Sequence, residues 1–171
     1  MSRVIFIGPP GSGKSSVGKA LARELGLTYE DTDASVTSIS GRSIAAIFAE
    51  LGESGFRKLE REVVLAALAS NIQVLSLGGG AVLDPDVQAA IKASEGTVIY
   101  LTIGLRYALS RIGNKGDRPL VASDPEKQWL KITSSREPIY RSLATIVKST
   151  DNKKPQEVAH EIAQLIGSAH E

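Results

Sequence analysis

The sequence predicts an α/β protein, a doubly wound three-layer sandwich in which helices cover both faces of a five-stranded parallel sheet. Two observations favour this fold class. Short apolar runs rich in valine and isoleucine alternate along the chain with amphipathic stretches of helical period, and the connections between them are short. In addition, a glycine-rich loop follows the first apolar run directly and leads into a helical pattern. The length of 171 residues suits a single domain, residues 1–171.

The strands are predicted from short apolar runs bounded by turn residues or polar segments. The first, 4–7, reads Val-Ile-Phe-Ile, and it is apolar throughout, as a buried parallel strand requires. A short run at 27–29 leads into a polar segment, and 74–77 is typical of a core strand that three glycines end. Two further runs, 97–101 and 146–147, complete the expected sheet.

The helices are predicted from the spacing of apolar side chains and from capping residues. The first follows the glycine-rich loop and ends at Gly26, because glycine commonly terminates a helix. Asp84-Pro85 and Asp124-Pro125 each combine an N-cap aspartate with a proline in the first turn, and Pro155 opens a terminal helix. Apolar residues at helical spacing indicate the remaining helices, at 43–51, 54–70 and 105–112.

Composition narrows the class of protein. Twenty Lys and Arg against nineteen Asp and Glu leave a net charge of +1, so no overall charge draws the chain to nucleic acid or an anionic membrane. The chain has no cysteine, which excludes disulfides and thiolate metal sites. No apolar run approaches the ~18 residues of a membrane span, and no signal segment precedes the first strand. We therefore expect a cytoplasmic protein without nucleic-acid or membrane partners. We also expect a monomer, because no exposed apolar stripe is evident.

Residues 8–15 form the glycine-rich loop and read Gly-Pro-Pro-Gly-Ser-Gly-Lys-Ser, a complete phosphate-loop motif. The glycines let the backbone approach phosphate groups, and the N-terminus of the next helix adds partial positive charge. Lys14 is expected to reach the β- and γ-phosphates, and the Ser15 hydroxyl to ligate Mg²⁺. The motif predicts a P-loop NTPase with Mg²⁺ as cofactor, and by itself it leaves GTPases, motor ATPases, nucleotide kinases and small-molecule kinases open. With the other motifs below, we expect a fold like that of the nucleoside-monophosphate kinases. The loop residues expected to bind ATP are Gly11, Ser12, Gly13, Lys14, Ser15 and Ser16.

Two polar clusters follow predicted strands, at the sheet edge where ligands bind in such folds. Asp31 and Asp33 are two residues apart, so on an extended segment both carboxylates face one side. One can hold Mg²⁺ while the other accepts a hydrogen bond from an acceptor hydroxyl; the alternative is an ordinary polar loop with an N-cap aspartate. Residues 78–80 are three glycines, which bring bare backbone to the mouth of the site, the alternative being a flexible turn.

Four arginines are further candidates, although each alone is typical of a solvated surface: Arg57, Arg111, Arg118 and Arg136. Arg118 lies in a polar, aperiodic segment, 113–124, which is interpreted as a mobile lid that brings this arginine onto the transferring phosphoryl group. Pro138 suggests a bent or interrupted helix with Arg136 at its inner edge.

Taken together, the motifs resemble those of the shikimate kinase family nearly from end to end. The phosphate loop, the two aspartates, Gly55-Phe56-Arg57-x-x-Glu60, the three glycines, Arg118-Pro119-Leu120 and Arg136-Glu137-Pro138-x-Tyr140 occur in that family's order and spacing. The resemblance implies transfer of the γ-phosphoryl group of ATP to the 3-hydroxyl of shikimate. The products are shikimate 3-phosphate and ADP, in the route to chorismate and the aromatic amino acids.

The resemblance also assigns roles to residues. It implies that shikimate is bound by Asp33, Arg57, Gly78, Gly79, Gly80 and Arg136. Asp33, Lys14 and Arg118 would be catalytic, Ser15 and Asp31 would support Mg²⁺, and Arg111 would pack against adenine. Residues 34–60 resemble the family's mobile substrate-binding helical region, and residues 112–124 its lid.

Two positions depart from the family pattern, and two other functions remain alternatives. Ser16 replaces a common threonine, and Lys153, which we expect at the adenine, stands where relatives commonly have an arginine. A kinase of the same fold with another small substrate, such as gluconate, shares the phosphate loop. A nucleotide-binding switch would need an N-K-x-D motif, which residues 114–117 match literally. We interpret that stretch as part of the lid, because it runs straight into Arg118 and does not follow a core strand.

Overall fold

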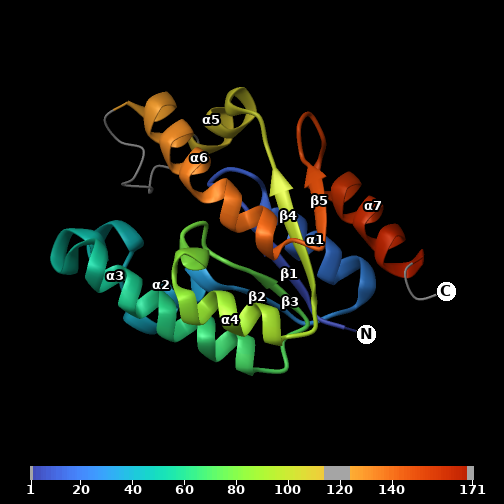
Figure 1. The fold of residues 1–171 in the computed structure, drawn as a ribbon, viewed down its shortest axis with the longest axis horizontal. Helices are drawn as coiled ribbons and strands as arrows, with labels where there is room; N and C mark the ends of the chain where they lie inside the picture. The colour runs from blue at the N-terminus through green and yellow to red at the C-terminus, as the bar shows by residue number, and fades with distance from the viewer. Residues whose placement is uncertain (1, 114–123, 169–171) are drawn as a thin grey trace.

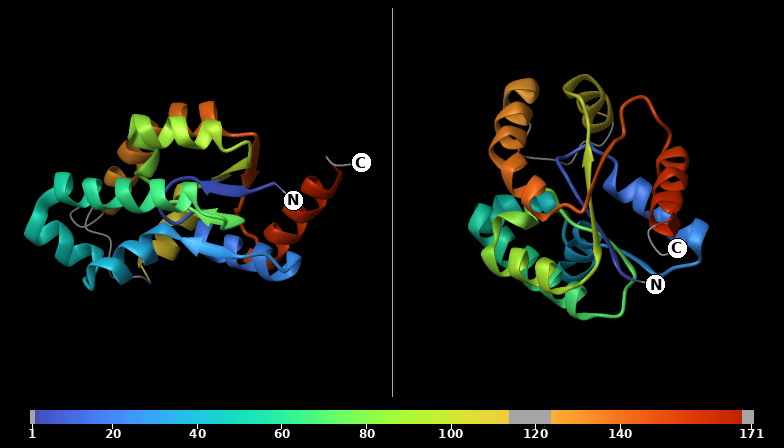
Figure 2. Two further views of the ribbon diagram at one scale, coloured as in Figure 1. Left: turned by 90° about the horizontal axis from the view of Figure 1, so that it is seen from below. Right: turned by 45° about the vertical axis from the view of Figure 1, so that its right-hand side comes forward.

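The computed structural model describes residues 2–113 and 124–168. Within them, five parallel strands form one sheet in the order β2-β3-β1-β4-β5. The strands are β1 (Val4–Ile7), β2 (Tyr29–Asp31), β3 (Val74–Ser76), β4 (Thr97–Thr102) and β5 (Ile146–Ser149). The described helices are α1 (Lys14–Leu25), α2 (Thr32–Ser40), α3 (Ile44–Ala69), α4 (Pro85–Ala93), α5 (Leu105–Gly113), α6 (Pro125–Leu143) and α7 (Pro155–Ser168), with a 3₁₀ turn, η1 (Ala81–Leu83). Figures 1 and 2 show helices on both sides of the sheet, which confirms the predicted fold class.

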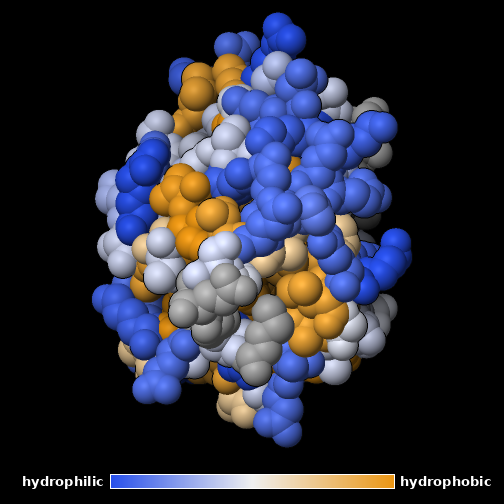
Figure 3. Space-filling model, turned by 90° about the vertical axis from the view of Figure 1, so that its right-hand side faces the viewer, coloured by the Kyte–Doolittle hydropathy of each residue, from blue (hydrophilic) through white to orange (hydrophobic). Residues whose placement is uncertain are grey.

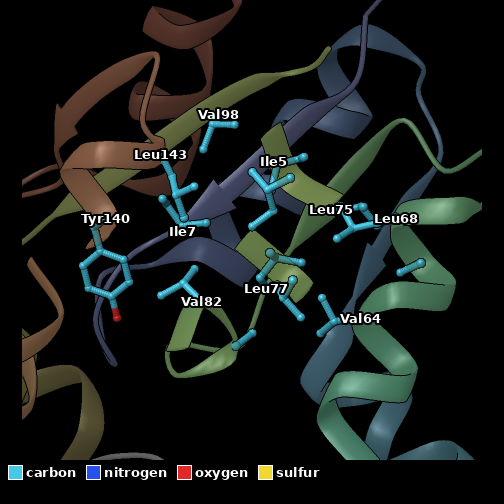
Figure 4. Close-up of a cluster of buried hydrophobic side chains, with 14 of the residues drawn as sticks. Ile5, Ile7, Val64, Leu68, Leu75, Leu77, Val82, Val98, Tyr140 and Leu143 are labelled. Carbon is cyan, nitrogen blue, oxygen red and sulfur yellow. The ribbon is translucent and has the colours of Figure 1, made fainter. Parts of the chain in front are cut away.

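The two faces of the sheet carry separate hydrophobic cores, because alternate residues of a strand point to opposite sides. Ile5 and Ile7 of β1 pack under α3, α4 and α6, with Val64, Val87 and Tyr140 (Figure 4). Val4 and Phe6 of the same strand face α1 and α7 and pack with a second set that includes Val17, Leu21, Val158 and Ile162. A strand buried on both sides must be apolar throughout, which explains the continuous run that predicted β1.

Local signals account for most helix ends. Gly26 ends α1 in the left-handed conformation, with φ of 66°. Asp84 caps α4, since its carboxylate accepts hydrogen bonds from the backbone N–H groups of Asp86 and Val87. Gly52, with φ of 69°, breaks α3 into the two helical segments that the spacing predicted. Of the two possibilities at Pro138, a bent or an interrupted helix, the interruption does not occur, because α6 continues as one helix from Pro125 to Leu143.

The second strand was predicted at the wrong residues. It covers Tyr29–Asp31, and not 27–29. Because β2 lies at the edge of the sheet and pairs only with β3, it can carry the polar Glu30 and Asp31, which hydrophobic patterning does not mark as strand. Asp31 is therefore both the last residue of the strand and the N-cap of α2.

The arrangement of the sheet brings five chain segments to one edge. All strands are parallel, so their carboxyl ends lie at one edge of the sheet. The segments at this edge are the phosphate loop after β1, Asp31 at the end of β2, the glycines after β3, α5 after β4 and Thr150 after β5. Beyond this edge, α2 and α3 share a small apolar cluster of their own, with Val36, Ile47, Phe56 and Val63 buried in it.

The surface is predominantly hydrophilic on the side that carries α7. Figure 3 shows that hydrophobic side chains reach this face only in separate patches. No described helix is both long and apolar enough to cross a membrane.

Candidate active site

The phosphate loop has the conformation that its glycines allow. Gly8, Gly11 and Gly13 all have positive φ, of 148°, 81° and 93°. A Cβ atom at Gly8 would lie 2.5 Å from the carbonyl oxygen of Leu101, and one at Gly11 would lie 2.9 Å from that of Ala108. The loop is therefore packed tightly against β4 and α5, and only glycine fits at these two positions.

Lys14 begins α1 and is almost completely buried. Its Nζ donates hydrogen bonds to the carbonyl oxygens of Gly8 and Pro9, at 2.8 and 3.0 Å, so the ammonium group lies across the loop. Ser12 is also fully buried, and its Oγ has no hydrogen-bond partner among the described residues. A buried hydroxyl without a partner is costly, and a polar ligand atom in the loop would satisfy it.

Ser15 and Asp31 come together from α1 and β2. The Ser15 hydroxyl donates a hydrogen bond to Oδ2 of Asp31, whose Oδ1 accepts the backbone N–H of Ala34 at the start of α2. A hydroxyl and a carboxylate are oxygen ligands of the kind that Mg²⁺ prefers, beside the phosphates of a nucleotide. The described residues hold no cluster of three or more His, Cys, Asp or Glu that could bind a metal alone.

A cavity of about 310 Å³ joins these groups to the predicted adenine side. The expected ATP-site residues that line it are Gly11, Gly13, Lys14, Ser15, Ser16, Arg111 and Lys153. Asp31 and Asp33 line it as well, at the end towards β2. Residues from α1, α2, α5 and the segment after β5 therefore lie around one cavity.

Arg111 and Lys153 differ in how they are held. Arg111 donates to the carbonyl oxygens of Gly11, at 3.3 Å, and Thr150, at 3.2 Å, which fixes its guanidinium beside the loop. Lys153 pairs with Glu161, with Nζ 3.0 Å from both carboxylate oxygens, and 37% of its side chain is exposed. Pro155, which sequence reasoning considered only as a helix start, also lines the cavity.

The three glycines lie between the acidic and basic groups predicted for the substrate. A Cβ atom at Gly78 would lie 2.5 Å from Oδ1 of Asp33 and 2.8 Å from Oε2 of Glu60. One at Gly80 would lie 2.3 Å from Nη1 of Arg57. The glycines therefore leave just enough space for these charged side chains to reach the backbone.

Gly79 links the phosphate loop to α6. A Cβ atom there would lie 3.3 Å from the carbonyl oxygen of Gly8 and 3.5 Å from Nη1 of Arg136. Arg136 is only 5% exposed, and Tyr140, one turn later, donates a hydrogen bond from its hydroxyl to the Gly79 carbonyl. Asp33 and Arg136 therefore lie against adjacent glycines, although 103 positions separate them in the sequence.

Arg57, which is partly buried, and Glu60, which is buried, form an ion pair on α3. Nη1 of Arg57 lies 2.7 Å from Oε1 of Glu60, which is 3% exposed. Burial raises the pKa of the Glu60 carboxyl, and the nearby Arg57 guanidinium opposes that rise without cancelling it. The pair lines a second cavity of about 600 Å³, together with Gly80.

Sequence reasoning missed two residues of this region. Glu60 appeared only as part of a motif, although its position three residues after Arg57 on a helix indicates a contact. Thr32 was overlooked between the two aspartates; its buried hydroxyl accepts the backbone N–H of Gly78 at 3.0 Å and so connects α2 to the glycines. Arg118, the stretch 114–117 and most of the predicted lid, 112–124, lie outside the described residues.

Comparisons with known proteins agree with this geometry. A family model described as shikimate kinase matches residues 10–167. The chain is 44% identical over 155 residues to a shikimate kinase of Streptomyces coelicolor, covering 91% of this chain and 90% of that protein. It is also 44% identical over 161 residues to one of Mycobacterium marinum, covering 94% of this chain and 86% of that protein.

Two solved structures are similar over nearly the whole chain. The shikimate kinase from Acinetobacter baumannii in complex with shikimate superposes with a TM-score of 0.93 at 32% identity, covering 99% of this chain and 95% of that one. The shikimate kinase of Aquifex aeolicus gives a TM-score of 0.81 at 34% identity, with 98% of both chains covered. The predicted resemblance is confirmed, and the chain belongs to the shikimate kinase family.

Proposed function

We propose that this chain carries out the reaction of its family, ATP-dependent phosphorylation of shikimate in aromatic biosynthesis, with the residues gathered at the carboxyl edge of the sheet. Members of the family are kinases, and the chain is an enzyme of this class. One observation supports the assignment of residues to roles. Asp33 lies against Gly78, Arg136 lies against the adjacent Gly79, and Gly79 also lies against the phosphate loop.

The nucleotide half of the site is the cavity beside the phosphate loop. The loop amides and Lys14 would bind the β- and γ-phosphates of ATP in this cavity. Ser12 does not line the cavity itself, although its buried hydroxyl lies in the same loop. Arg111, held beside the loop by its hydrogen bond to the Gly11 carbonyl, would pack on adenine through its guanidinium face. Lys153 lines the same cavity and would contribute positive charge near the base.

The acceptor half suits a small ring that carries one carboxylate and several hydroxyls. Arg57 and Arg136 present two guanidinium groups to the region of the glycines, which fits a carboxylate. Asp33 and the backbone of Gly79 can hydrogen-bond ring hydroxyls. Glu60 holds Arg57 in place by their buried ion pair.

Asp33 is proposed as the general base. It would accept the proton of the acceptor hydroxyl as that oxygen bonds to the γ-phosphorus and the bond from this phosphorus to the bridging oxygen of ADP breaks. Lys14 would neutralise charge on the β- and γ-phosphates, and Arg118 is proposed to do the same. Phosphoryl transfer passes through a loose transition state, in which the bonds to the transferred group are weak. The contribution of the protein is therefore positioning and charge stabilisation.

Ser15 and Asp31 are proposed to hold Mg²⁺, because the pair offers a hydroxyl and a carboxylate beside the phosphate loop. The ion, when bound, would neutralise charge on the nucleotide phosphates. A monomer is proposed because every group used here comes from one chain. A cytoplasmic location is proposed because the reaction consumes ATP.

The function is tested by a phosphoryl-transfer assay with ATP and Mg²⁺ across shikimate, gluconate and nucleoside monophosphates. We expect ADP to form at a substantial rate only with shikimate. Transfer to gluconate in its place would assign the chain to a different small-molecule kinase. Preference for GTP over ATP in a binding titration, without transfer to any acceptor, would favour a nucleotide switch.

A further inference from the structure

Two carbonyl groups of the phosphate loop accept hydrogen bonds from side chains that are far away in the sequence. The indole N–H of Trp129, on α6, donates to the carbonyl oxygen of Pro10 at 2.9 Å. The hydroxyl of Thr150, directly after β5, donates to the carbonyl oxygen of Ser12 at 2.8 Å. The two side chains are 3% and 1% exposed, so water does not compete for either bond.

Both side chains are fixed by their surroundings. Trp129 packs in a small apolar cluster with Ile103 and Ala108. The backbone N–H of Thr150 donates to the carbonyl of Thr102, which extends the pairing of β5 with β4 by one residue. Arg111 donates to the carbonyl of Thr150, and it also approaches the Thr150 hydroxyl, at 3.4 Å. Neither donor can turn away from the loop without disturbing the elements beneath it.

The two bonds fix the planes of two peptide groups. A trans peptide is planar, with its C=O and N–H pointing in opposite directions. Holding the Pro10 carbonyl outward therefore turns the N–H of Gly11 inward, and holding the Ser12 carbonyl outward does the same for the N–H of Gly13. Glycine tolerates many backbone conformations, so these two amides would otherwise be the least constrained of the loop.

We propose that Trp129 and Thr150 are positioning residues, which aim the N–H groups of Gly11 and Gly13 into the phosphate site before ATP binds. The inference rests on the proposed binding of ATP in this loop. Preformed amide donors bind phosphate without first being ordered, so the two bonds are expected to contribute to nucleotide affinity more than to shikimate affinity.

Thr150→Val and Thr150→Ser separate the hydroxyl from the shape of the side chain. Valine has nearly the same volume but no hydroxyl, and it leaves the buried Ser12 carbonyl without that donor. We expect Thr150→Val to raise the KM for ATP and the Kd for ADP about tenfold, with the KM for shikimate within about twofold. Thr150→Ser, which keeps the hydroxyl, is expected to restore both constants to within about threefold of the starting protein.

Thr145→Val is the matched control. Thr145 stands before β5, and its hydroxyl accepts the backbone N–H of Val98 at 2.7 Å, far along the sheet from the loop. This change also removes a hydroxyl that bonds to backbone, and it should lower the melting temperature without changing the KM for ATP. An unchanged KM for ATP and Kd for ADP in Thr150→Val, or an equal loss in Thr150→Ser, would overturn the proposal.

Trp129→Phe provides an independent test if Thr150→Val does not fold. Phenylalanine fills most of the indole volume but has no N–H, so we expect a rise of about five- to tenfold in the Kd for ADP, measured by calorimetry. An unchanged Kd in the folded variant would contradict the proposal. Failure of the unmodified protein to bind ADP at all would instead refute the proposed function of the loop.

Discussion

The hydroxyl of Tyr140 donates a hydrogen bond of 2.6 Å to the carbonyl oxygen of Gly79, which ties α6 to the glycines after β3. Burial raises the pKa of Tyr140 to about 12, so the hydroxyl keeps its proton and remains a donor at any pH at which the protein works. The bond orients the peptide between Gly79 and Gly80, beside the guanidinium of Arg136.

Tyr140→Phe removes this donor and leaves the ring in place. We expect the KM for shikimate to rise about fivefold, because roughly 1 kcal/mol of hydrogen-bond energy positions the Gly79 backbone. The KM for ATP should change less than that for shikimate. Steady-state kinetics with each substrate varied in turn would measure both constants, and an equal rise in the two would contradict a local effect on the acceptor site.

Asp33→Asn keeps the shape of the side chain but removes a group that can take a proton. We expect kcat to fall at least ~100-fold, the scale of a lost general base. Asp151→Asn is the control, since Asp151 is an aspartate near the same edge of the sheet whose carboxylate accepts the backbone N–H of Gly104 at 2.7 Å and does not line the cavity. A kcat for Asp33→Asn near that of the control would show that Asp33 binds the substrate but does not act as the general base.

Alanine at Gly78 and at Gly80 should affect different kinetic constants. The new Cβ at Gly80 would meet the guanidinium of Arg57, and that at Gly78 would meet the carboxylate of Asp33 most closely and that of Glu60 next. Both obstacles are ends of flexible side chains, so the fold should survive while the side chain moves. We expect Gly80→Ala mainly to raise the KM for shikimate and Gly78→Ala mainly to lower kcat, each about tenfold or more.

A circular dichroism spectrum and a thermal melt would verify that both glycine variants fold. Equal effects of the two variants on both constants would show that the glycines act as one unit, contrary to this expectation.

Glu60 should make stability depend on pH. Its pKa is raised above the ordinary 4.5 in the folded protein, chiefly by burial, so the folded state keeps a proton that the unfolded chain has lost. The contribution of Glu60 is thus fully present below pH 4.5 and declines as pH rises through the higher folded pKa. Urea unfolding across this range would measure the free energy of unfolding of the protein and of Glu60→Gln. We expect the value for the protein with Glu60 to fall relative to that of Glu60→Gln as pH rises. A constant difference, or one of opposite sign, would contradict this.

The sequence was sufficient to predict those parts of the structure that depend on residues adjacent in the chain. The phosphate loop, the cap at Asp84 and the helix end at Gly26 depend on a few consecutive residues, and each was predicted correctly. The edge strand was displaced, because pairing on one side only relaxes the demand for apolar residues that patterning relies on.

Contacts between residues that are distant in the sequence were harder to predict. The family resemblance selected Asp33, Arg57 and Arg136, but it did not indicate how the glycines separate them. Helical spacing indicates only that Trp129 packs against neighbouring apolar residues; it does so, and its N–H also reaches the Pro10 carbonyl, 119 positions away. Such bonds follow from which helix lies over which loop, and helical periodicity alone does not determine that placement.

The two cavities share no lining residue, and this separation matters for the design of selective inhibitors. The cavity at the phosphate loop is built largely from a motif that many unrelated nucleotide-binding enzymes possess, so compounds directed there face abundant off-target proteins. The other cavity has the charged side chains of Arg57 and Glu60 in its wall and none of the phosphate-loop residues, so a compound bound there would not occupy the proposed site of ATP.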